Sequence, residues 1–288
     1  MNLARRPEEL SGAERAVAIG TFDGVHLGHR RVVEGLVASG LVPTVLTFDP
    51  HPRRLLGYRV ELICTVERRL ELLAEAGVQD VLMLEFTLEM QRLEPGEFVA
   101  QVLEPIGTKV VVVGPDFHFG HHRRGTVEYL TGRGYEVRGV PAVQGVSSTQ
   151  IRQLVQAGHV VDASRSLGRP VEVEGIVVEG DARGGTLGFP TANLDVPPDL
   201  LCPGYGIYAG AARDFRAAVS IGTNPHYGGA ERRIEAFLLD FHGDLYGERL
   251  VVELWSRLRD EGAFSSEQEL IDQIALDVEQ TRLARRPL

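Results

Sequence analysis

The first half of the chain alternates short apolar runs with segments whose apolar residues recur every three or four positions. The runs are typical of strands buried on both faces, and the segments between them are typical of amphipathic helices. This pattern predicts strands at 15–22, 42–48, 80–86, 109–114 and 135–143, and helices at 28–40, 65–77, 95–107, 126–134 and 147–158. Strands and helices in this order indicate an α/β doubly wound layer around a parallel sheet.

Beyond residue 164 the pattern changes to strands alone. Strands are predicted at 171–180, 205–212, 215–222, 233–241 and 248–255, separated by turns rich in Gly and Pro. Such a series indicates an antiparallel sheet or barrel. Apolar residues at helical spacing then predict an amphipathic helix at 265–286. We therefore expect two domains, residues 1–165 and 166–288.

Composition narrows the class of protein. Of the 288 residues 43% are hydrophobic and 24% charged, as in a globular protein with a full-sized core. The net charge of −10 argues against nucleic acid or an anionic membrane as the main partner. Cys64 and Cys202 have no metal-ligand spacing, which favours a reducing compartment. Because the sequence has no signal-peptide pattern and no membrane-spanning apolar run, we expect a cytoplasmic protein. A monomer and a homo-oligomer both remain open.

The first candidate site is the predicted turn "GTFDGVHLGH", between the first strand and the first helix. In a parallel sheet this turn is a favoured seat for a phosphate, because helix amides and the helix dipole point toward it. His26 and His29 would donate hydrogen bonds to a phosphoryl group, while Gly20, Gly24 and Gly28 let the backbone approach closely. On spacing alone, two solvated histidines in an ordinary turn remain an alternative.

A second segment suited to phosphate is "SSTQIR" at 147–152, where hydroxyl side chains and an arginine meet a helix start. Any helix start can carry such residues, so this segment is informative only together with the histidine turn. The two favour nucleotide chemistry. The sequence has no G-x-x-x-x-G-K-[ST], and its single lysine, Lys109, opens a predicted buried strand. A P-loop is therefore excluded.

In the second half, "GDARGGTLGFPTANL" is too rich in glycine for a regular strand, and we expect a mobile loop. Gly184, Gly185 and Gly188 would let it approach phosphates closely. Thr191 and Asn193 offer neutral oxygens two residues apart, which suit a Mg²⁺ that also binds phosphate oxygens. An ordinary turn is the alternative.

Glu235 is the most informative residue of this half. It shares one face of its predicted strand with Phe237 and Leu239, and the other face is apolar as well. A buried carboxylate needs a partner or a chemical task. Two interpretations stay open: a structural ion pair with Arg232 or Arg233, or a general base for a hydroxyl that attacks phosphorus.

In the first half "GTFDGVHLGH", "TFDPHP", "GPDFHFG" and "SSTQIR" occur in order, and this set resembles the nucleotidyltransferase half of the bacterial bifunctional riboflavin kinases/FAD synthetases. The resemblance implies that His26 and His29 bind the ATP phosphates and stabilise the transition state. It implies flavin contacts at Phe48 and Pro50, and nucleotide contacts at Gly20, Thr21, Phe22, Asp23, Asp116, Ser148, Thr149 and Arg152. Gly145 departs from the family pattern, since many relatives have a basic residue there.

The second half resembles riboflavin kinase over nearly its whole length, through "GTLGFPTANL", "PGYGIYAG", "IEAFLLDF" and "DLYGERLVVEL". The resemblance implies a six-stranded antiparallel barrel followed by a C-terminal helix. It also implies a site with the Mg²⁺ ligands Thr191 and Asn193, nucleotide contacts at Gly188 and Pro190, and Glu235 as the base on the ribityl 5′-hydroxyl. Gly185 and His226 depart from the pattern, which has Arg or Lys and Thr or Ser there.

Together these expectations describe a bifunctional enzyme. Its barrel would phosphorylate riboflavin with ATP to give FMN, and its first domain would join FMN to the AMP moiety of ATP, releasing FAD and pyrophosphate. Mg²⁺ would assist both steps. A class I aminoacyl-tRNA synthetase shares H-x-G-H but needs a lysine-bearing loop that one lysine cannot supply. A nucleotidyltransferase for another substrate is opposed by the kinase-like second half. A flavin-binding regulator with decayed sites is opposed by the intact motif residues.

Overall fold

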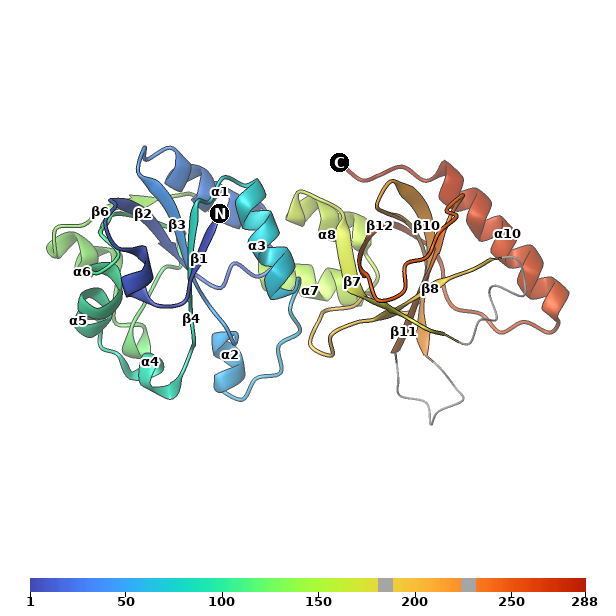
Figure 1. Cartoon of the computed structure of the whole chain (residues 1–288), viewed down its shortest axis with the longest axis horizontal. Helices are drawn as coiled ribbons and strands as arrows, with labels where there is room; N and C mark the ends of the chain where they lie inside the picture. The colour runs from blue at the N-terminus through green and yellow to red at the C-terminus, as the bar shows by residue number, and fades with distance from the viewer. Residues whose placement is uncertain (181–188, 224–231) are drawn as a thin grey trace. The chain divides into compact units, whose positions relative to one another are not determined.

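The structure is a computed structural model that describes residues 1–180, 189–223 and 232–288 (Figure 1). The chain packs as two compact units. The first comprises Met1–Val60 and Thr65–Ser147, and the second comprises Glu61–Cys64 and Ser148–Leu288. The change between the units thus falls before α7 (Ser148–Gln156) and α8 (Val160–Leu167), whereas the change in sequence pattern lies at residue 165.

A six-stranded parallel sheet forms the centre of the first unit, with the strand order β1-β4-β3-β2-β5-β6. Its strands are β1 (Asn2–Ala4), β2 (Arg15–Ile19), β3 (Val42–Phe48), β4 (Asp80–Leu84), β5 (Thr108–Val113) and β6 (Glu136–Gly139). The five predicted strands are confirmed. The sequence did not predict β1, because three residues are too few to show a period.

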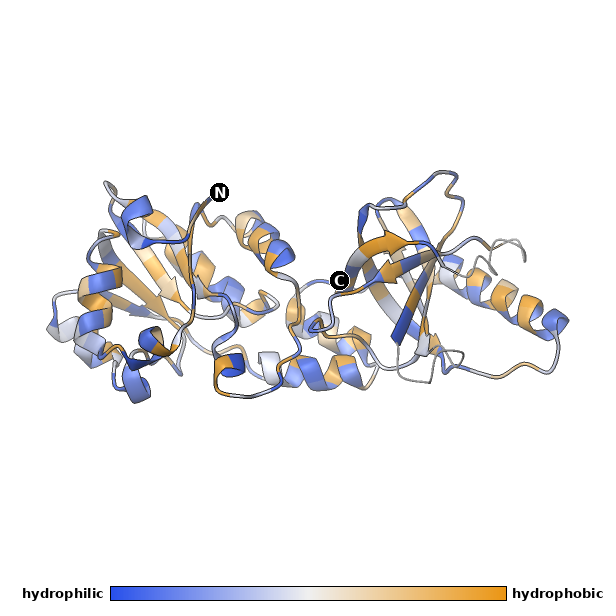
Figure 2. Cartoon of the chain, turned by 60° about the horizontal axis from the view of Figure 1, so that its bottom comes forward, coloured by the Kyte–Doolittle hydropathy of each residue, from blue (hydrophilic) through white to orange (hydrophobic). Residues whose placement is uncertain are grey.

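Helices cover both faces of this sheet (Figure 1). They are α1 (Leu27–Val37), α2 (Pro52–Leu55), α3 (Val66–Glu75), α4 (Leu88–Arg92), α5 (Pro95–Phe98), which continues as a π-helical turn at Val99–Leu103, and α6 (Val127–Gly132), with 3₁₀ turns at Pro7–Leu10 and His121–Arg123. Helix α1 packs on β2, β3 and β5. Apolar residues gather on the strands and on the inner sides of the helices, as Figure 2 shows in orange. This burial holds the carboxyl ends of the strands in place.

The second unit is built on a closed six-stranded barrel with the order β10-β11-β8-β7-β12-β9, in which every neighbouring pair is antiparallel. Its strands are β7 (Val171–Val178), β8 (Ala192–Asp195), β9 (Gly206–Ala212), β10 (Phe215–Thr223), β11 (Arg232–Leu238) and β12 (Arg249–Arg259). The predicted fold class is confirmed. The expectation of a loop throughout the glycine-rich stretch is wrong at its end, where β8 pairs with both β7 and β11.

The predicted C-terminal helix is α10 (Glu267–Leu283), which packs on β9 and β10. Its buried residues are polar, because Asp277 and Thr281 face the barrel, while Leu270, Ile271, Ile274 and Val278 are half-buried. The carboxylate of Asp277 accepts hydrogen bonds from Nε and Nη2 of Arg259 at 3.0 and 2.8 Å. A buried, two-pronged ion pair therefore fixes the position of this helix on the barrel.

Candidate functional sites

The histidine turn is organised by the first residue of the H-x-G-H motif. His26 caps α1, and its Nδ1 accepts a hydrogen bond from the backbone N–H of His29 at 3.3 Å. Because Nδ1 is an acceptor, the proton of a neutral His26 lies on Nε2, which is the donor nitrogen of the ring. The two imidazole rings stack with their centroids 3.7 Å apart. A Cβ at Gly28 would lie only 3.1 Å from the His26 ring, so a larger residue there would press on that ring.

The backbone of the turn adopts conformations that side chains rarely allow. Phe22 and Val25 have φ values of 49° and 38°, in the left-handed region. The centroid of the Phe22 ring lies 5.0 Å from that of the His29 ring. Asp23, the next residue after Phe22, is buried. The predicted nucleotide residues Gly20, Thr21, Phe22 and Asp23 are thus brought together with both histidines. Strain of this kind persists only where the surroundings hold it, and it is common at functional sites.

His29 is held in its neutral form. Its Nδ1 is shielded from solvent and has no hydrogen-bond partner in the part of the chain that the structure describes. Burial, followed by the neighbouring His26 and then by Arg69, lowers the pKa of His29 well below its usual value of 6.5. A neutral imidazole offers one donor and one acceptor nitrogen, so at physiological pH His29 can contribute hydrogen bonds but no charge.

Arg69 is the residue of this site that sequence reasoning missed. It lies on α3 and is only 3% exposed, and its Nη1 donates a hydrogen bond to the carbonyl of Thr21 at 2.8 Å. The sequence did hold a signal, because the helical period puts Arg69 on the same face as the buried Leu72 and Leu73. An arginine on the apolar face of a helix needs a partner inside the protein.

The remaining predicted residues of the first unit lie at the same edge of the sheet. Phe48 ends β3 and packs edge-to-face on Phe86, with centroids 5.3 Å apart, and Pro50 follows it in an exposed position. Asp116 is exposed just after β5. Since β3 and β5 flank β2, their carboxyl ends open beside the histidine turn, where ligands of such sheets bind.

The predicted phosphate contacts Ser148, Thr149 and Arg152 all lie on α7. Because α7 belongs to the second unit, the structure does not place them relative to the histidines. Arg152 donates from Nε to the carbonyl of Glu61 at 2.7 Å, and it thereby ties the Glu61–Cys64 segment to α7. These three residues remain predictions.

In the barrel, three predicted residues converge on one face of β8 and β11. The hydroxyl of Thr191 donates to Oε2 of Glu235 at 3.2 Å, and Asn193 lies directly opposite Glu235 in the strand register. Pro190 precedes this group in the chain. Gly188, with Gly184, Gly185 and His226, lies outside the described residues. The register therefore joins two motifs that are more than 40 residues apart in sequence.

The chemistry of this group fits a magnesium ion. Oδ1 of Asn193 is shielded from solvent and has no hydrogen-bond partner among the described residues. A buried oxygen without a donor is costly unless a cation or another donor reaches it. Neutral side-chain oxygens beside a carboxylate suit Mg²⁺, which prefers oxygen ligands and shares them with phosphates. Elsewhere in the described ranges, no cluster of three or more His, Cys, Asp or Glu residues is arranged to hold a metal ion.

The expectation of a fully buried Glu235 is wrong. Ile234 and Ala236 point into the barrel, so Glu235 lies on the outer face, and its side chain is 28% exposed. The alternative ion pair is present, since Nε of Arg233 lies 3.2 Å from Oε1 of Glu235. One oxygen of the carboxylate thus faces Arg233 and the other faces Thr191, which orients the group without burying it.

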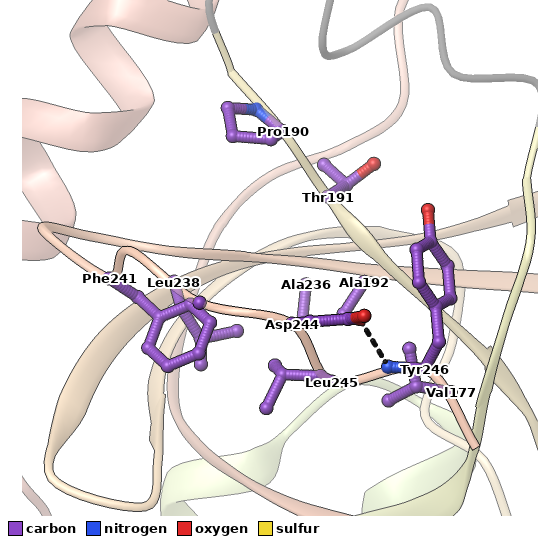
Figure 3. Close-up of a pocket in the computed structure, with 11 residues that line it drawn as sticks. Val177, Pro190, Thr191, Ala192, Ala236, Leu238, Phe241, Asp244, Leu245 and Tyr246 are labelled. Atoms are coloured by element: carbon purple, nitrogen blue, oxygen red, sulfur yellow. Dashed lines mark hydrogen bonds between the residues drawn. The ribbon is translucent and has the colours of Figure 1, made fainter. Parts of the chain in front are cut away.

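A small cavity of about 140 Å³ lies on the inner side of the same strands (Figure 3). Inward residues such as Ala236 and Leu238 line it, and the chain from Phe241 to Tyr246 borders it, stabilised by a hydrogen bond from the Tyr246 N–H to Asp244 at 2.9 Å. Ligand pockets usually exceed about 300 Å³, so this cavity is too small for a flavin or a whole nucleotide. Thr191 borders both the cavity and the Glu235 group.

A doubly wound layer with an H-x-G-H turn, joined to a barrel that carries a Thr/Asn/Glu group, defines a two-site enzyme of nucleotide chemistry. A family model of FAD synthetase matches residues 9–153, and a model of riboflavin kinase matches residues 167–284. The bifunctional riboflavin kinase/FMN adenylyltransferases of Listeria monocytogenes and Escherichia coli are each 34% identical to this chain, which covers 94% and 93% of their lengths over 96% of its own. The chain belongs to this family, and it makes FMN from riboflavin and FAD from FMN with ATP.

A crystal structure from Streptococcus pneumoniae has the same fold throughout, with a TM-score of 0.88 and 32% identity over 97% of this chain and 98% of that one. Its title describes that protein as a macrolide-efflux protein. No helix in the described part of the present chain is long and apolar enough to cross a membrane. The family models and the curated relatives agree with each other on the flavin enzymes.

Proposed function

We propose that the two reactions take place at two separate sites, the histidine turn for adenylylation and the Thr191, Asn193 and Glu235 group for phosphorylation. The reactions need different nucleophiles, a phosphate oxygen of FMN and the ribityl 5′-hydroxyl of riboflavin. The hydrogen bond from Thr191 to Glu235, with Asn193 opposite, is the observation that best supports the kinase assignment.

In the phosphorylation step, Glu235 accepts the proton of the 5′-hydroxyl as that oxygen attacks the γ-phosphorus of ATP, the bond from this phosphorus to the bridging oxygen breaks, and ADP leaves. A carboxylate held by Arg233 and Thr191 is oriented for this task, and its partial exposure leaves room for the substrate. Thr191 and Asn193 would hold Mg²⁺, which neutralises phosphate charge when it is bound. Pro190 and the glycine-rich segment before it would contact the nucleotide.

In the adenylylation step, His26 and His29 donate hydrogen bonds to the phosphates of ATP while FMN attacks the α-phosphorus and pyrophosphate leaves. Nε2 of His26 is the donor nitrogen of that ring, because Nδ1 accepts the capping hydrogen bond. Donors fixed before the reaction stabilise the growing phosphoryl charge without reorganising. Phe48 and Pro50 would contact the flavin, and Asp116, Ser148, Thr149 and Arg152 would contact the nucleotide.

We also propose that residues 1–165 and 166–288 are the functional domains, and that the enzyme works in the cytoplasm without a nucleic acid partner. The net charge of −10 and the presence of only two cysteines support the last two points.

One experiment tests the division of labour. Wild type, His29→Ala and Glu235→Gln are each incubated with riboflavin, ATP and Mg²⁺, and FMN and FAD are separated by chromatography over time. We expect FMN before FAD in the wild type, and FMN without FAD in His29→Ala. In Glu235→Gln we expect neither product from riboflavin, but FAD when FMN is added. The assignment fails if His29→Ala still makes FAD, or if Glu235→Gln phosphorylates riboflavin at the normal rate.

A further inference from the structure

The carbonyl of Thr21, in the middle of the histidine turn, is held from two different elements. Nη1 of Arg69 on α3 donates to it at 2.8 Å, and the hydroxyl of Thr47 on β3 donates to it at 3.1 Å. Nη1 of Arg69 also lies 3.4 Å from the Thr47 hydroxyl oxygen. Thr47 is fully buried. These three groups form one closed set of polar contacts beneath the turn.

Arg69 carries a buried charge beneath the turn. It is 3% exposed, and among the described residues it makes no ion pair with a carboxylate. Its Nε is also shielded from solvent, and no hydrogen-bond partner for it lies within residues 1–180, 189–223 and 232–288. Buried arginines are normally paired, because an unpaired buried charge is strongly unfavourable. A cation left without a counterion beside a nucleotide-binding turn is therefore suited to an anion that comes with the substrate.

The backbone of the turn that Arg69 contacts is strained. Phe22 and Val25 both have positive φ values, and Val25 is β-branched, for which that conformation is least favourable. Phe22 packs on His29, and His29 stacks on His26. A shift of Thr21 would therefore move Phe22 and, through it, both imidazole rings.

We propose that Arg69 is a positioning residue of the adenylylation site, which fixes the histidine turn through the carbonyl of Thr21 and supplies a buried positive charge that favours the polyphosphate of ATP. The inference rests on the proposed assignment of that site to His26 and His29. The same charge also contributes to keeping His29 neutral, since Arg69 is one of the groups that lower its pKa, after burial and His26. The hydrogen bond from Arg69 and its positive charge thus both act on the two imidazole rings.

The test uses the full chain, because riboflavin phosphorylation in the other unit reports on the integrity of each preparation. Arg69→Met removes both the hydrogen bond and the charge. Arg69→Lys keeps the charge but loses the planar geometry. Thr47→Val removes the second hydrogen bond to Thr21 and the weak contact with Arg69, but it leaves the hydrogen bond from Arg69 to Thr21. Arg68→Met is the matched control, because Arg68 directly precedes Arg69 on the same helix. Its Nη1 forms ion pairs with Oε2 of Glu71 at 2.9 Å and with Oε1 of Glu75 at 3.1 Å.

Initial rates of FAD formation from FMN are measured against ATP concentration, together with riboflavin phosphorylation and thermal unfolding. For Arg69→Met we expect kcat/KM of adenylylation to fall about tenfold or more, chiefly through a higher KM for ATP. In Arg69→Lys, KM for ATP should return closer to its wild-type value than kcat does, because the charge is kept and the planar geometry is lost. Phosphorylation should stay normal in every variant, and Arg68→Met should match the wild type in both reactions.

Adenylylation by Arg69→Met within about twofold of wild type would overturn the inference. If that variant does not fold, Thr47→Val and Arg69→Lys decide instead: both should adenylylate FMN more slowly while melting near the wild-type temperature, and unchanged rates in both would overturn it. The underlying site assignment is tested separately by His29→Ala. Normal FAD synthesis by His29→Ala would refute the assignment of the site to the histidine turn. If His29→Ala loses FAD synthesis while Arg69→Met keeps the normal rate, only the role of Arg69 is refuted.

Discussion

Thr191 and Glu235, 44 residues apart in sequence, are joined by a hydrogen bond of 3.2 Å from the threonine hydroxyl to Oε2 of the carboxylate. The antiparallel register of β8 and β11 causes this contact, because it sets Asn193 opposite Glu235 and places Thr191 on the same outer face. The bond occupies one carboxylate oxygen and Arg233 occupies the other. Glu235 is thus held in a single orientation at the partly open surface of the barrel.

Glu235→Gln should lower the rate of riboflavin phosphorylation by about 10²–10⁴, because the amide cannot accept the proton of the attacking hydroxyl. FMN adenylylation and the melting temperature should change little. Steady-state rates of both reactions and a thermal melt check this. Glu253→Gln is the matched control, because Glu253 is also a partly exposed strand carboxylate paired with an arginine, Arg286, but lies on β12. Equal losses in the two variants would contradict a catalytic role.

The lowered pKa of His29 predicts a specific pH dependence of stability. Below about pH 6.5 the unfolded chain protonates this histidine while the folded protein does not, so unfolding becomes easier as the pH falls. His29→Gln should therefore lose less melting temperature between pH 7.5 and 5.5 than the wild type does. An NMR signal of His29 that titrates near pH 6.5 would refute the neutral, buried imidazole.

Gly180→Ala should weaken the binding of Mg²⁺ and ATP to the barrel. A Cβ at Gly180 would lie 2.6 Å from Oδ1 of Asn193, and closer still to the rest of its amide, so the Asn193 side chain must move. Displacing a metal ligand through a neighbour commonly costs about 10–100-fold in metal affinity. We expect a higher Mg²⁺ concentration at half-maximal riboflavin phosphorylation, and unchanged adenylylation.

The control for that variant is Gly262→Ala, in the same unit, where a Cβ would meet nothing closer than 3.9 Å. A normal Mg²⁺ requirement in Gly180→Ala would show that Asn193 is not a ligand, or that its side chain has room to move.

The sequence revealed the elements and the motif residues better than it revealed which side of a strand faces the core. In β11 the residues Ile234 and Phe237 are equally apolar, so periodicity alone left Glu235 on a face that looked buried. Closure of the barrel decides the matter, because it turns Ile234 and Ala236 inward. A three-dimensional property of this kind is not encoded in the period of a single strand.

Arg69 was missed for a different reason. Its partners Thr21 and Thr47 lie 48 and 22 residues away and carry no motif that points to α3. The histidine pair, by contrast, depends on the local sequence, because the cap of α1 and the space at Gly28 are set within four residues. The arrangement of the two histidines could therefore be predicted from neighbouring residues, whereas the contacts of Arg69 with Thr21 and Thr47 could not.

Two fragments of the second unit should differ in stability. A fragment of residues 166–288 begins within the last turn of α8, whereas residues 148–288 include all of α7 and α8. The shorter fragment loses Ile151, Val155 and Val160, which are buried in the barrel core, each worth about 1.5–3 kcal/mol on burial. It also loses Ser164, whose hydroxyl oxygen accepts a hydrogen bond from the N–H of Val171 at the start of β7.

The longer fragment should fold, phosphorylate riboflavin and melt at a clearly higher temperature, as measured by circular dichroism and FMN formation. Equal melting temperatures would mean that the two helices add nothing to the barrel. A folded 148–288 fragment without kinase activity would mean that residues of the first unit complete the kinase site.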